Sequence, residues 1–444
     1  MLVSGAAAGE KFDPARLERN PPFRYRVDMI RLAPLAAAAV LALASCSREP
    51  TSAVIMTDSP EFAFYVDTFN ASQDRYRLEL RFRPNVPKAL AQETEAPPAL
   101  AVGRFLANDQ ARSRFVNLDY LFRELIVNPS GVYQGLLQRG EFDGRQLLLP
   151  VSFNMPLAAW KRGQISPAKD NFVISLDEMR AAAADRNKIS GSAFVRMGFS
   201  PRWDPDFLLL FARMSGTAFR EGSPLSWSDE GLAAALETVR AWSSEVNRSA
   251  ADEDDFQFKY LYLPRHLSVQ EERIAFAYMD SSQFFLLSEE RRAALEYRWI
   301  ARGTAIPVLE EAVYAGILRR GRGRTAAESF LKWFFREETQ RYLLEKTRAL
   351  RTSETIFGIA GGFSSIRSVN EKVLPGFYPS LLGHLPPPEY IEAPPVLPPD
   401  WTDLAGRVLK PFLINAAGNV PPDFDPKSDL RRRMDQWKRQ TAGS

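Results

Sequence analysis

The stretch AVIMTDSP, residues 53–60, predicts a buried strand that ends in a turn and leads directly into a helix. Ser59 can cap this helix, with Pro60 at its first position. Further strands are predicted at residues 76–82 and 99–105. The alternation of strand, helix and strand predicts an α/β fold with parallel strands and crossover helices.

The chain beyond this region continues to mix strands and helices. Ser228 can cap the clearest predicted helix, and the two acids after it suit the positive end of the helix dipole. In chain order, we expect strands at 147–154 and 156–160, a mainly helical region at 177–246 with its clearest helix at 228–246, strands at 274–279 and 313–318, an amphipathic helix at 326–346, and a proline-rich segment after residue 383 that ends in one or two short helices.

Residues 32–46 predict where the protein is found. An apolar run at 32–44 follows Arg31 and ends in small residues, which is the pattern of a signal peptide. As a helix, this run would be about 20 Å long, too short for a bilayer core of about 30 Å. The order LASC at 43–46 resembles a bacterial lipobox, whose cysteine is lipidated. We therefore expect Cys46 to anchor the protein to the membrane of the cell envelope, facing the periplasm or exterior; a secreted protein and an uncleaved anchor are the alternatives.

The N-terminal region also contains two possible start sites. Met29 gives a short basic segment before the apolar run, whereas residues 1–28 carry several acids, which are uncommon in a signal peptide. We expect residues 1–45 to combine a mis-assigned start with the signal peptide, and residues 46–52 to form a lipidated tether.

Composition excludes several classes of function. The net charge of +3 is too small for a nucleic-acid-binding face, so no nucleic-acid partner is expected. The two histidines, His266 and His384, are far apart in sequence, and the chain has a single cysteine. A zinc site, a Cys–His pair and a Ser–His–Asp triad are therefore disfavoured, and no metal or cofactor is expected.

The order of these blocks resembles the extracellular solute-binding lipoproteins of bacterial ABC importers, of the sugar-binding type (family 1-like). The resemblance covers residues 53 to about 376. It includes LPVSFN at 149–154, RIAFAYM at 273–279, the passage from IPV at 306–308 to AGI at 315–317, and the helix from Thr325 to Tyr342. The chain departs from the family pattern at AWKR, residues 159–162, at Phe276, and in its proline-rich end.

This resemblance implies a fold, a mode of action and a set of partners. The fold would be type II, with two α/β lobes that each contain a mostly parallel sheet flanked by helices, joined by hinge strands. A small solute, with a sugar or oligosaccharide favoured, would bind in the cleft and be handed by a monomer to the permease. The lobes would be lobe 1 at 53–155, lobe 2 at 156–303, a return to lobe 1 at 304–350, and a return to lobe 2 with proline-rich C-terminal helices at 351–444.

Ligands of open α/β sheets bind at the carboxyl ends of strands, so the candidate contacts follow the predicted strands. Asp58, Ser59 and Glu61 follow the first strand, although Ser59 fits the role of helix cap at least as well. Arg104 ends the third strand and suits a bidentate bond to an anionic or polyol group, but surface arginines are common.

Further candidates lie at the crossover and in the second lobe. Ser152 and Asn154 lie at the first crossover, Asp280 and Ser281 follow a strand, and Tyr314 fits either the cleft or the core. Trp203 and Asp204, in a loop rich in proline, suit a sugar site because a ring can stack on a pyranose while a carboxylate binds its hydroxyls. The alternative is that this tryptophan plugs the surface of the lobe.

Three classes of function remain open. A non-enzymatic binding protein is favoured. A lipid-anchored glycoside hydrolase would need two paired carboxylates, for which Asp204 and Asp280 are the candidates, but nothing in the sequence pairs them. A sensory or structural lipoprotein would keep the fold without transport.

Overall fold

The computed structural model describes residues 51–441, apart from 93–95, 125–126, 166–169, 171, 223 and 351–354. The predicted signal peptide and Cys46 lie outside the described residues. Thr51 and Ser52, which were predicted to belong to the tether, already form part of the first strand. Among the described residues, no helix is both long and apolar enough to cross a membrane.

Lobe 1 is built on a six-stranded sheet in the order β15-β6-β14-β3-β1-β2. β1 pairs in parallel with β2 and β3, whereas β14 and β15 run antiparallel to their neighbours. The strands are β1 (Thr51–Thr57), β2 (Tyr76–Phe82), β3 (Leu100–Arg104), β6 (Leu149–Phe153), β14 (Val313–Ile317) and β15 (Phe363–Ser364), and a small hairpin joins β4 (Glu141–Phe142) to β5 (Arg145–Gln146).

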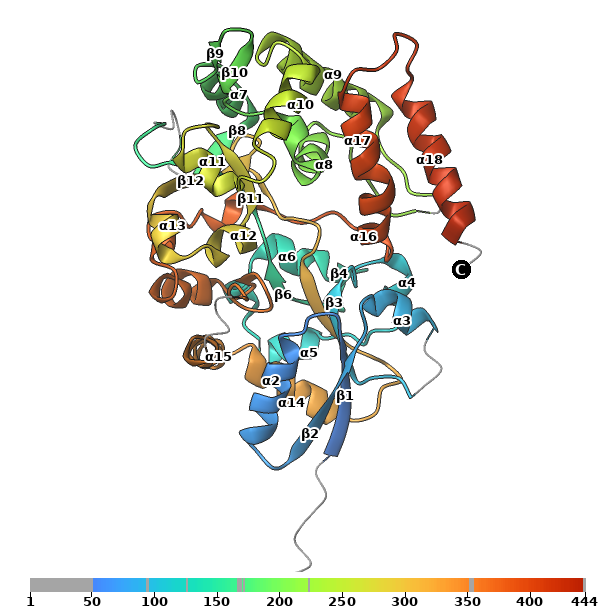
Figure 1. The fold of residues 1–444 in the computed structure, drawn as a ribbon. Helices are drawn as coiled ribbons and strands as arrows, with labels where there is room; N and C mark the ends of the chain where they lie inside the picture. The colour runs from blue at the N-terminus through green and yellow to red at the C-terminus, as the bar shows by residue number, and fades with distance from the viewer. Residues whose placement is uncertain are drawn as a thin grey trace, which may run out of the picture. The chain divides into compact units, whose positions relative to one another are not determined.

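Helices pack on this sheet (Figure 1), and the residues that α2 and α14 bury are mostly apolar. Phe62 of α2 contacts the rings of Phe330 and Phe334 of α14 at centroid distances of 6.2 and 5.6 Å. This cluster exists because large apolar residues recur at helical spacing on both helices. The helices are α2 (Phe62–Ala71), α3 (Val86–Gln92), α4 (Asp109–Arg112), α5 (Asp119–Arg123), α6 (Gln134–Arg139), α14 (Arg324–Phe334) and α15 (Glu337–Ala349).

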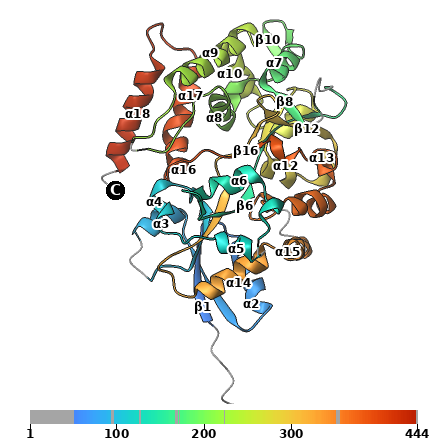
Figure 2. The ribbon, with the colours of Figure 1, turned by 180° about the vertical axis from the view of Figure 1, so that it is seen from behind.

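Lobe 2 is built on a four-stranded sheet in the order β11-β7-β12-β8. Its strands are β7 (Pro156–Lys161), β8 (Val173–Ser175), β11 (Ala277–Asp280) and β12 (Leu295–Ala301), with a separate hairpin of β9 (Lys188–Ser190) and β10 (Ala193–Arg196). Its helices are α7 (Leu176–Ala184), α8 (Pro205–Met214), α9 (Asp229–Glu245), α10 (Ala250–Lys259), α11 (Arg265–Gln270), α12 (Ser281–Leu286), α13 (Glu289–Ala293), α16 (Trp401–Leu404), α17 (Lys410–Ala417) and α18 (Pro426–Thr441). The C-terminal helices α17 and α18 lie beside α8 and α9, as both views show (Figures 1 and 2).

Within the described residues, the chain passes between the two sheets three times. The first passage runs from β6 to β7, and the second runs from β12 through β13 (Ile306–Pro307) to β14. The third runs from β15 to α16 and contains β16 (Ile391–Glu392), which pairs in parallel with β13. The second and third passages therefore lie side by side where the lobes join.

The α/β content and the two lobes are as predicted, but several details of the prediction are wrong. Both sheets are mixed rather than mostly parallel, because the strands of the return passages run antiparallel to their neighbours. β15 pairs with β6, so lobe 1 includes residues beyond 350. The helix predicted at 326–346 is two helices, α14 and α15. The region at 177–246 is mainly helical as predicted, although it also contains the β9–β10 hairpin.

Candidate functional site

A cavity of about 300 Å³ lies where the passages between the lobes meet lobe 2. We call it the interlobe cavity. Polar side chains from α8, α12, α17 and the segment after β13 surround it, together with Asn154 of the first crossover and the rings of Tyr278 and Trp401. Its lining residues are Asn154, Asp206, Leu209, Leu210, Tyr278, Asp280, Ser282, Gln283, Leu309, Glu310, Glu311, Trp401, Thr402, Ala405 and Lys410.

A charged cluster of lobe 1 is joined to this cavity through Glu311. Asp58, which follows β1, accepts hydrogen bonds from the backbone N–H of Arg104 at 3.1 Å and from its Nε at 3.3 Å. The other side of the same guanidinium donates to Glu311 at 2.9 Å. Gly103 permits this arrangement, since a Cβ there would lie 3.0 Å from Asp58 Oδ1. The ends of β1 and β3 are thus tied together at the edge where ligands of α/β sheets bind.

Burial controls the protonation of this cluster. It raises the pKa of the Asp58 carboxyl, an effect that the Arg104 guanidinium offsets only in part. It also raises the pKa of Glu61, and the Asp58 carboxylate adds to that rise. For Arg104, burial lowers the pKa, but the Glu311 and Asp58 carboxylates outweigh it and the pKa is raised. The cluster therefore holds an arginine that stays charged beside carboxyls that are costly to ionise.

This cluster predicts a pH dependence of stability. Because the pKa of Asp58 is raised in the folded protein, the folded state binds more protons than the unfolded chain above the ordinary value of 3.8. Its contribution to the free energy of unfolding therefore falls as the pH rises through the raised pKa. We expect wild type to lose stability relative to Asp58→Asn as the pH rises from about 4 to 7. Urea unfolding of both proteins across this range measures the difference; a difference that grows in favour of wild type would contradict the assignment.

Asn154 connects the two lobes at the first crossover. Its Nδ2 donates to the carbonyl of Gly361 at 3.0 Å, and its Oδ1 accepts from Ser281 Oγ at 2.6 Å. Ser281 Oγ in turn accepts from the backbone N–H of Met155 at 3.2 Å. Glu61 lies close by, since a Cβ added to Gly361 would be 3.6 Å from Glu61 Oε1. The polar groups that the sequence places after separate strands thus meet in one network.

The wall of lobe 2 presents further charges. Asp280 caps α12: its Oδ1 accepts from the backbone N–H of Gln283 at 2.8 Å and from Ser282 Oγ at 2.6 Å. Its Oδ2 has no hydrogen bond within the part of the chain that the structure describes. Asp206, at the start of α8, forms an ion pair with Lys410. The cavity therefore offers carboxylate acceptors and an ammonium donor on the same side.

Solved structures with this arrangement of lobes are numerous. The cyclic α-maltosyl-1,6-maltose binding protein of Arthrobacter globiformis has a TM-score of 0.57 at 16% identity, over 87% of this chain and 98% of the other. The sugar-binding protein MalE of Xanthomonas citri has a TM-score of 0.59 at 10% identity, over 87% of this chain and 96% of the other. A sugar transporter protein of Rhizobium etli, in an open conformation, has a TM-score of 0.62 at 11% identity, over 86% of this chain and 99% of the other. The chain has the solute-binding-protein fold. No protein-family model matches the sequence, and no curated protein matches it either.

Within the solute-binding-protein fold, seven of the predicted contacts lie at or beside the interlobe cavity. Asn154 and Asp280 line the cavity, and the Ser281 hydroxyl donates a hydrogen bond to Asn154 Oδ1. Asp58, Ser59, Glu61 and Arg104 belong to the lobe 1 cluster next to it. Ser59 does not cap α2 with its side chain, because the helix begins at Phe62 and the Ser59 hydroxyl donates to Asp58 instead, at 3.3 Å.

The structure places the remaining four predicted residues elsewhere. Trp203 is only 5% exposed; its ring stacks on Phe256 and its Nε1–H donates to the carbonyl of Glu253 at 3.1 Å. Asp204 caps α8 through the backbone N–H groups of Asp206 and Phe207 and does not line the cavity. Ser152 and Tyr314 are buried and donate to the carbonyls of Ala360 and Leu136. The Trp203 indole N–H and the Ser152 and Tyr314 hydroxyls thus donate inside the protein, and Asp204 caps a helix through Oδ1 away from the cavity, so none of the four lines the interlobe cavity.

Sequence reasoning missed several groups that line the cavity. Asp206, which lines the cavity, lies two residues after Asp204 at the same helix start, so the sequence pointed to the right segment and to a neighbouring carboxylate. Glu310 and Glu311 lie on the second crossover, directly after the quoted block at 306–308. Lys410 and Trp401 come from the C-terminal helices, beyond the region of resemblance, and no pattern in the sequence links them to the cavity.

Proposed function

We propose that this protein binds a small neutral carbohydrate in the interlobe cavity and delivers it to an ABC permease. The observation that carries the proposal is the lining of the cavity. Asp206, Asp280, Glu310 and Glu311 provide acceptors for sugar hydroxyls, and Lys410 provides a donor. Sugars also need apolar surface, and the partly exposed side chain of Leu309 lines the cavity beside Tyr278 and Trp401, which are themselves only 8% and 2% exposed.

The size of the cavity narrows the ligand class. About 300 Å³ is at the lower end of the range for ligand cavities, which suits a mono- or disaccharide better than a long oligosaccharide. The structures with the same fold include proteins described as bound with mannobiose and with α-D-tagatose. Binding at the junction of the two lobes suits a hinge-closing protein, because closure buries the solute and presents a distinct form to a partner.

The proposal includes location and the absence of catalysis. Lipidation of Cys46 would hold the protein, as a monomer, on the membrane surface where a permease is found. A glycoside hydrolase needs two carboxylates held beside one subsite, and the pair that the sequence suggested for this role is not brought to one cavity. Of the pair considered, Asp280 lines the cavity, whereas Asp204 caps a helix and does not.

Thermal unfolding of the purified protein against mono- and disaccharides, polyols, amino acids and peptides tests this function. A ligand at about 100 times its dissociation constant adds about 2.7 kcal/mol to the stability of the folded state. We expect a rise in midpoint with one class of neutral sugar, recovered unchanged afterwards. A panel without any rise would overturn the proposal and favour the sensory or structural alternative, and a cleaved sugar would favour the enzyme.

A further inference from the structure

A second and larger cavity, of about 700 Å³, lies beside the segment that contains β16. We call it the arginine cavity. Trp401 lines both cavities, but the charged residues of the two differ. Its lining residues with side-chain charge are Asp109, Arg139, Arg213, Arg220, Glu221, Arg302 and Glu392. The sugar-binding function proposed above uses none of them.

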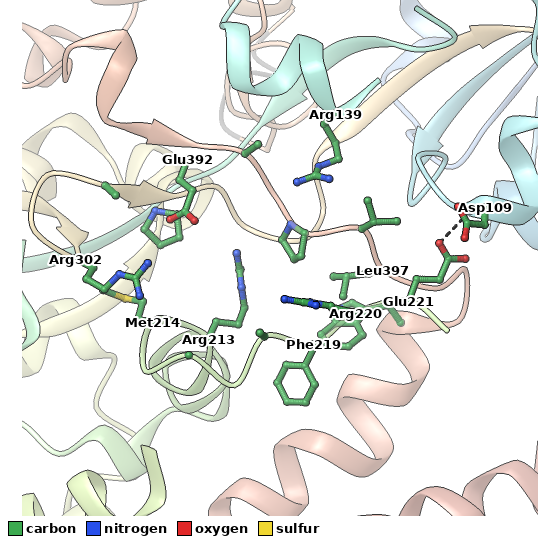
Figure 3. A pocket seen from close by; sticks show the side chains of 18 residues that line it. Asp109, Arg139, Arg213, Met214, Phe219, Arg220, Glu221, Arg302, Glu392 and Leu397 are labelled. Atoms are coloured by element: carbon green, nitrogen blue, oxygen red, sulfur yellow. Dashed lines mark hydrogen bonds between the residues drawn. The ribbon is translucent and has the colours of Figure 1, made fainter. Parts of the chain in front are cut away.

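Four guanidinium groups point into this space from different elements (Figure 3). Arg139 is the last residue of α6 in lobe 1, and Arg302 follows β12 in lobe 2. Arg213 lies near the end of α8, and Arg220 follows that helix. The cavity therefore gathers cationic side chains from both lobes.

Most of this positive charge lacks a partner. Within the described residues, the side chains of Arg139, Arg220 and Arg302 have no hydrogen bond and no ion pair, and Nε of Arg139 is buried without an acceptor. Only Arg213 is neutralised, by Glu310 at 2.7 Å, with a further bond to the carbonyl of Val308. A buried donor without an acceptor destabilises the protein, so an oxyanion bound at this point would be stabilised.

The acids of the cavity do not cancel the arginines. Glu221 accepts from the backbone N–H of Asp109 at 3.0 Å, and Asp109 pairs with Arg112. Figure 3 shows these two acids together at one edge, away from Arg139. Glu392 lies on the opposite side, near Arg302, but forms no ion pair with it among the described residues. The centre of the cavity is thus left to guanidinium groups.

We propose that the arginine cavity binds a small molecule that carries a phosphate or carboxylate group. Guanidinium groups bind such oxyanions through paired, charge-assisted hydrogen bonds, and several arginines from different directions can share one anion. The volume leaves room for a sugar-sized body attached to the anion. Since Arg139 belongs to lobe 1 and the other three to lobe 2, the bound anion connects the lobes at a place separate from the sugar cavity.

Titration calorimetry of the purified protein tests this site with three probes: inorganic phosphate, glucose 6-phosphate and glucuronate. We expect saturable binding of at least one probe, and Arg139→Gln and Arg302→Gln each to weaken it about tenfold or more. Arg302 is exposed, so its replacement keeps the test valid if the Arg139 variant fails to fold.

The control is Arg123→Gln, which removes the same charge from an exposed position on α5 that lines neither cavity. It should bind the probe as wild type does. Stronger binding of glucose 6-phosphate than of phosphate would mean that the sugar body contributes, and equal binding would identify the anion as the recognised group. The proposal is overturned if no probe binds, or if the Arg139 and Arg302 variants bind as well as the control. Affinity for neutral sugars is measured separately, so this test does not depend on the proposed transport function.

Discussion

Replacement of Asp280 by asparagine is expected to weaken sugar binding by about 10- to 100-fold while leaving the fold intact. The carboxylate lines the interlobe cavity, and its Oδ2 is not engaged by the described residues, so it is placed to accept hydroxyls of a sugar. A hydrogen bond to a charged group contributes about 1.5–3 kcal/mol, which corresponds to this loss. Asparagine caps a helix about as well as aspartate does, so α12 should keep its start. Calorimetric titration with the sugar identified by thermal unfolding measures the change.

The matched control for this variant is Asp425→Asn. Asp425 also accepts backbone N–H groups at a helix start, from Lys427 at 3.2 Å and Ser428 at 3.1 Å, but it is far along the chain and lines neither cavity. The control should bind sugar as wild type does. If the Asp280 variant also bound with unchanged affinity, the carboxylate would not be a ligand contact and the proposed cavity would lose its main acceptor.

Replacement of Trp203 by alanine is expected to cost about 3–5 kcal/mol of folding free energy, with little direct effect on sugar affinity. The ring is buried against Phe256 at a centroid distance of 5.5 Å, and Arg265 lies over it at 5.4 Å. Its removal leaves a cavity and takes away the indole N–H bond to the carbonyl of Glu253. Urea unfolding gives the stability change, and calorimetry below the unfolding transition gives the affinity.

Trp203→Phe separates the two contributions of the tryptophan. It keeps an aromatic ring for stacking but lacks the indole N–H, so it should cost less than the alanine variant. A loss of sugar binding of tenfold or more in the phenylalanine variant, with stability near that of wild type, would instead make Trp203 a sugar platform. Such a result would restore the contact that the sequence alone suggested.

That Asp58 and Trp203 contact a ligand stays a prediction, but the two residues show which positions local sequence can place near the interlobe cavity. Asp58 was found because a strand of apolar residues ends directly before it, and ligands of α/β folds bind at strand ends. That rule depends only on local sequence. Trp203 looks equally suitable in its loop, but its burial depends on Phe256 and Glu253, which are about fifty residues away in the chain. Nothing local in the sequence reports such a contact.

The parts of the site that were missed have a similar cause. Asp206 and Lys410 form an ion pair across about two hundred residues. Lys410 reaches the cavity because α17 packs on α8, and this packing follows from the tertiary fold of lobe 2 rather than from any motif. The strand order was likewise predicted only in part: the βαβ pattern gave the parallel pairing of β1 with β2 and β3, whereas the antiparallel strands arrive from distant return passages.

A crystal structure of the protein with its most stabilising sugar tests the central claim most directly. The account predicts the sugar in the interlobe cavity, with hydroxyls within hydrogen-bond distance of Asp280 and at least one of Asp206 and Lys410. A sugar bound in the arginine cavity or on the outer surface of either lobe, with the interlobe cavity holding only water, would contradict it.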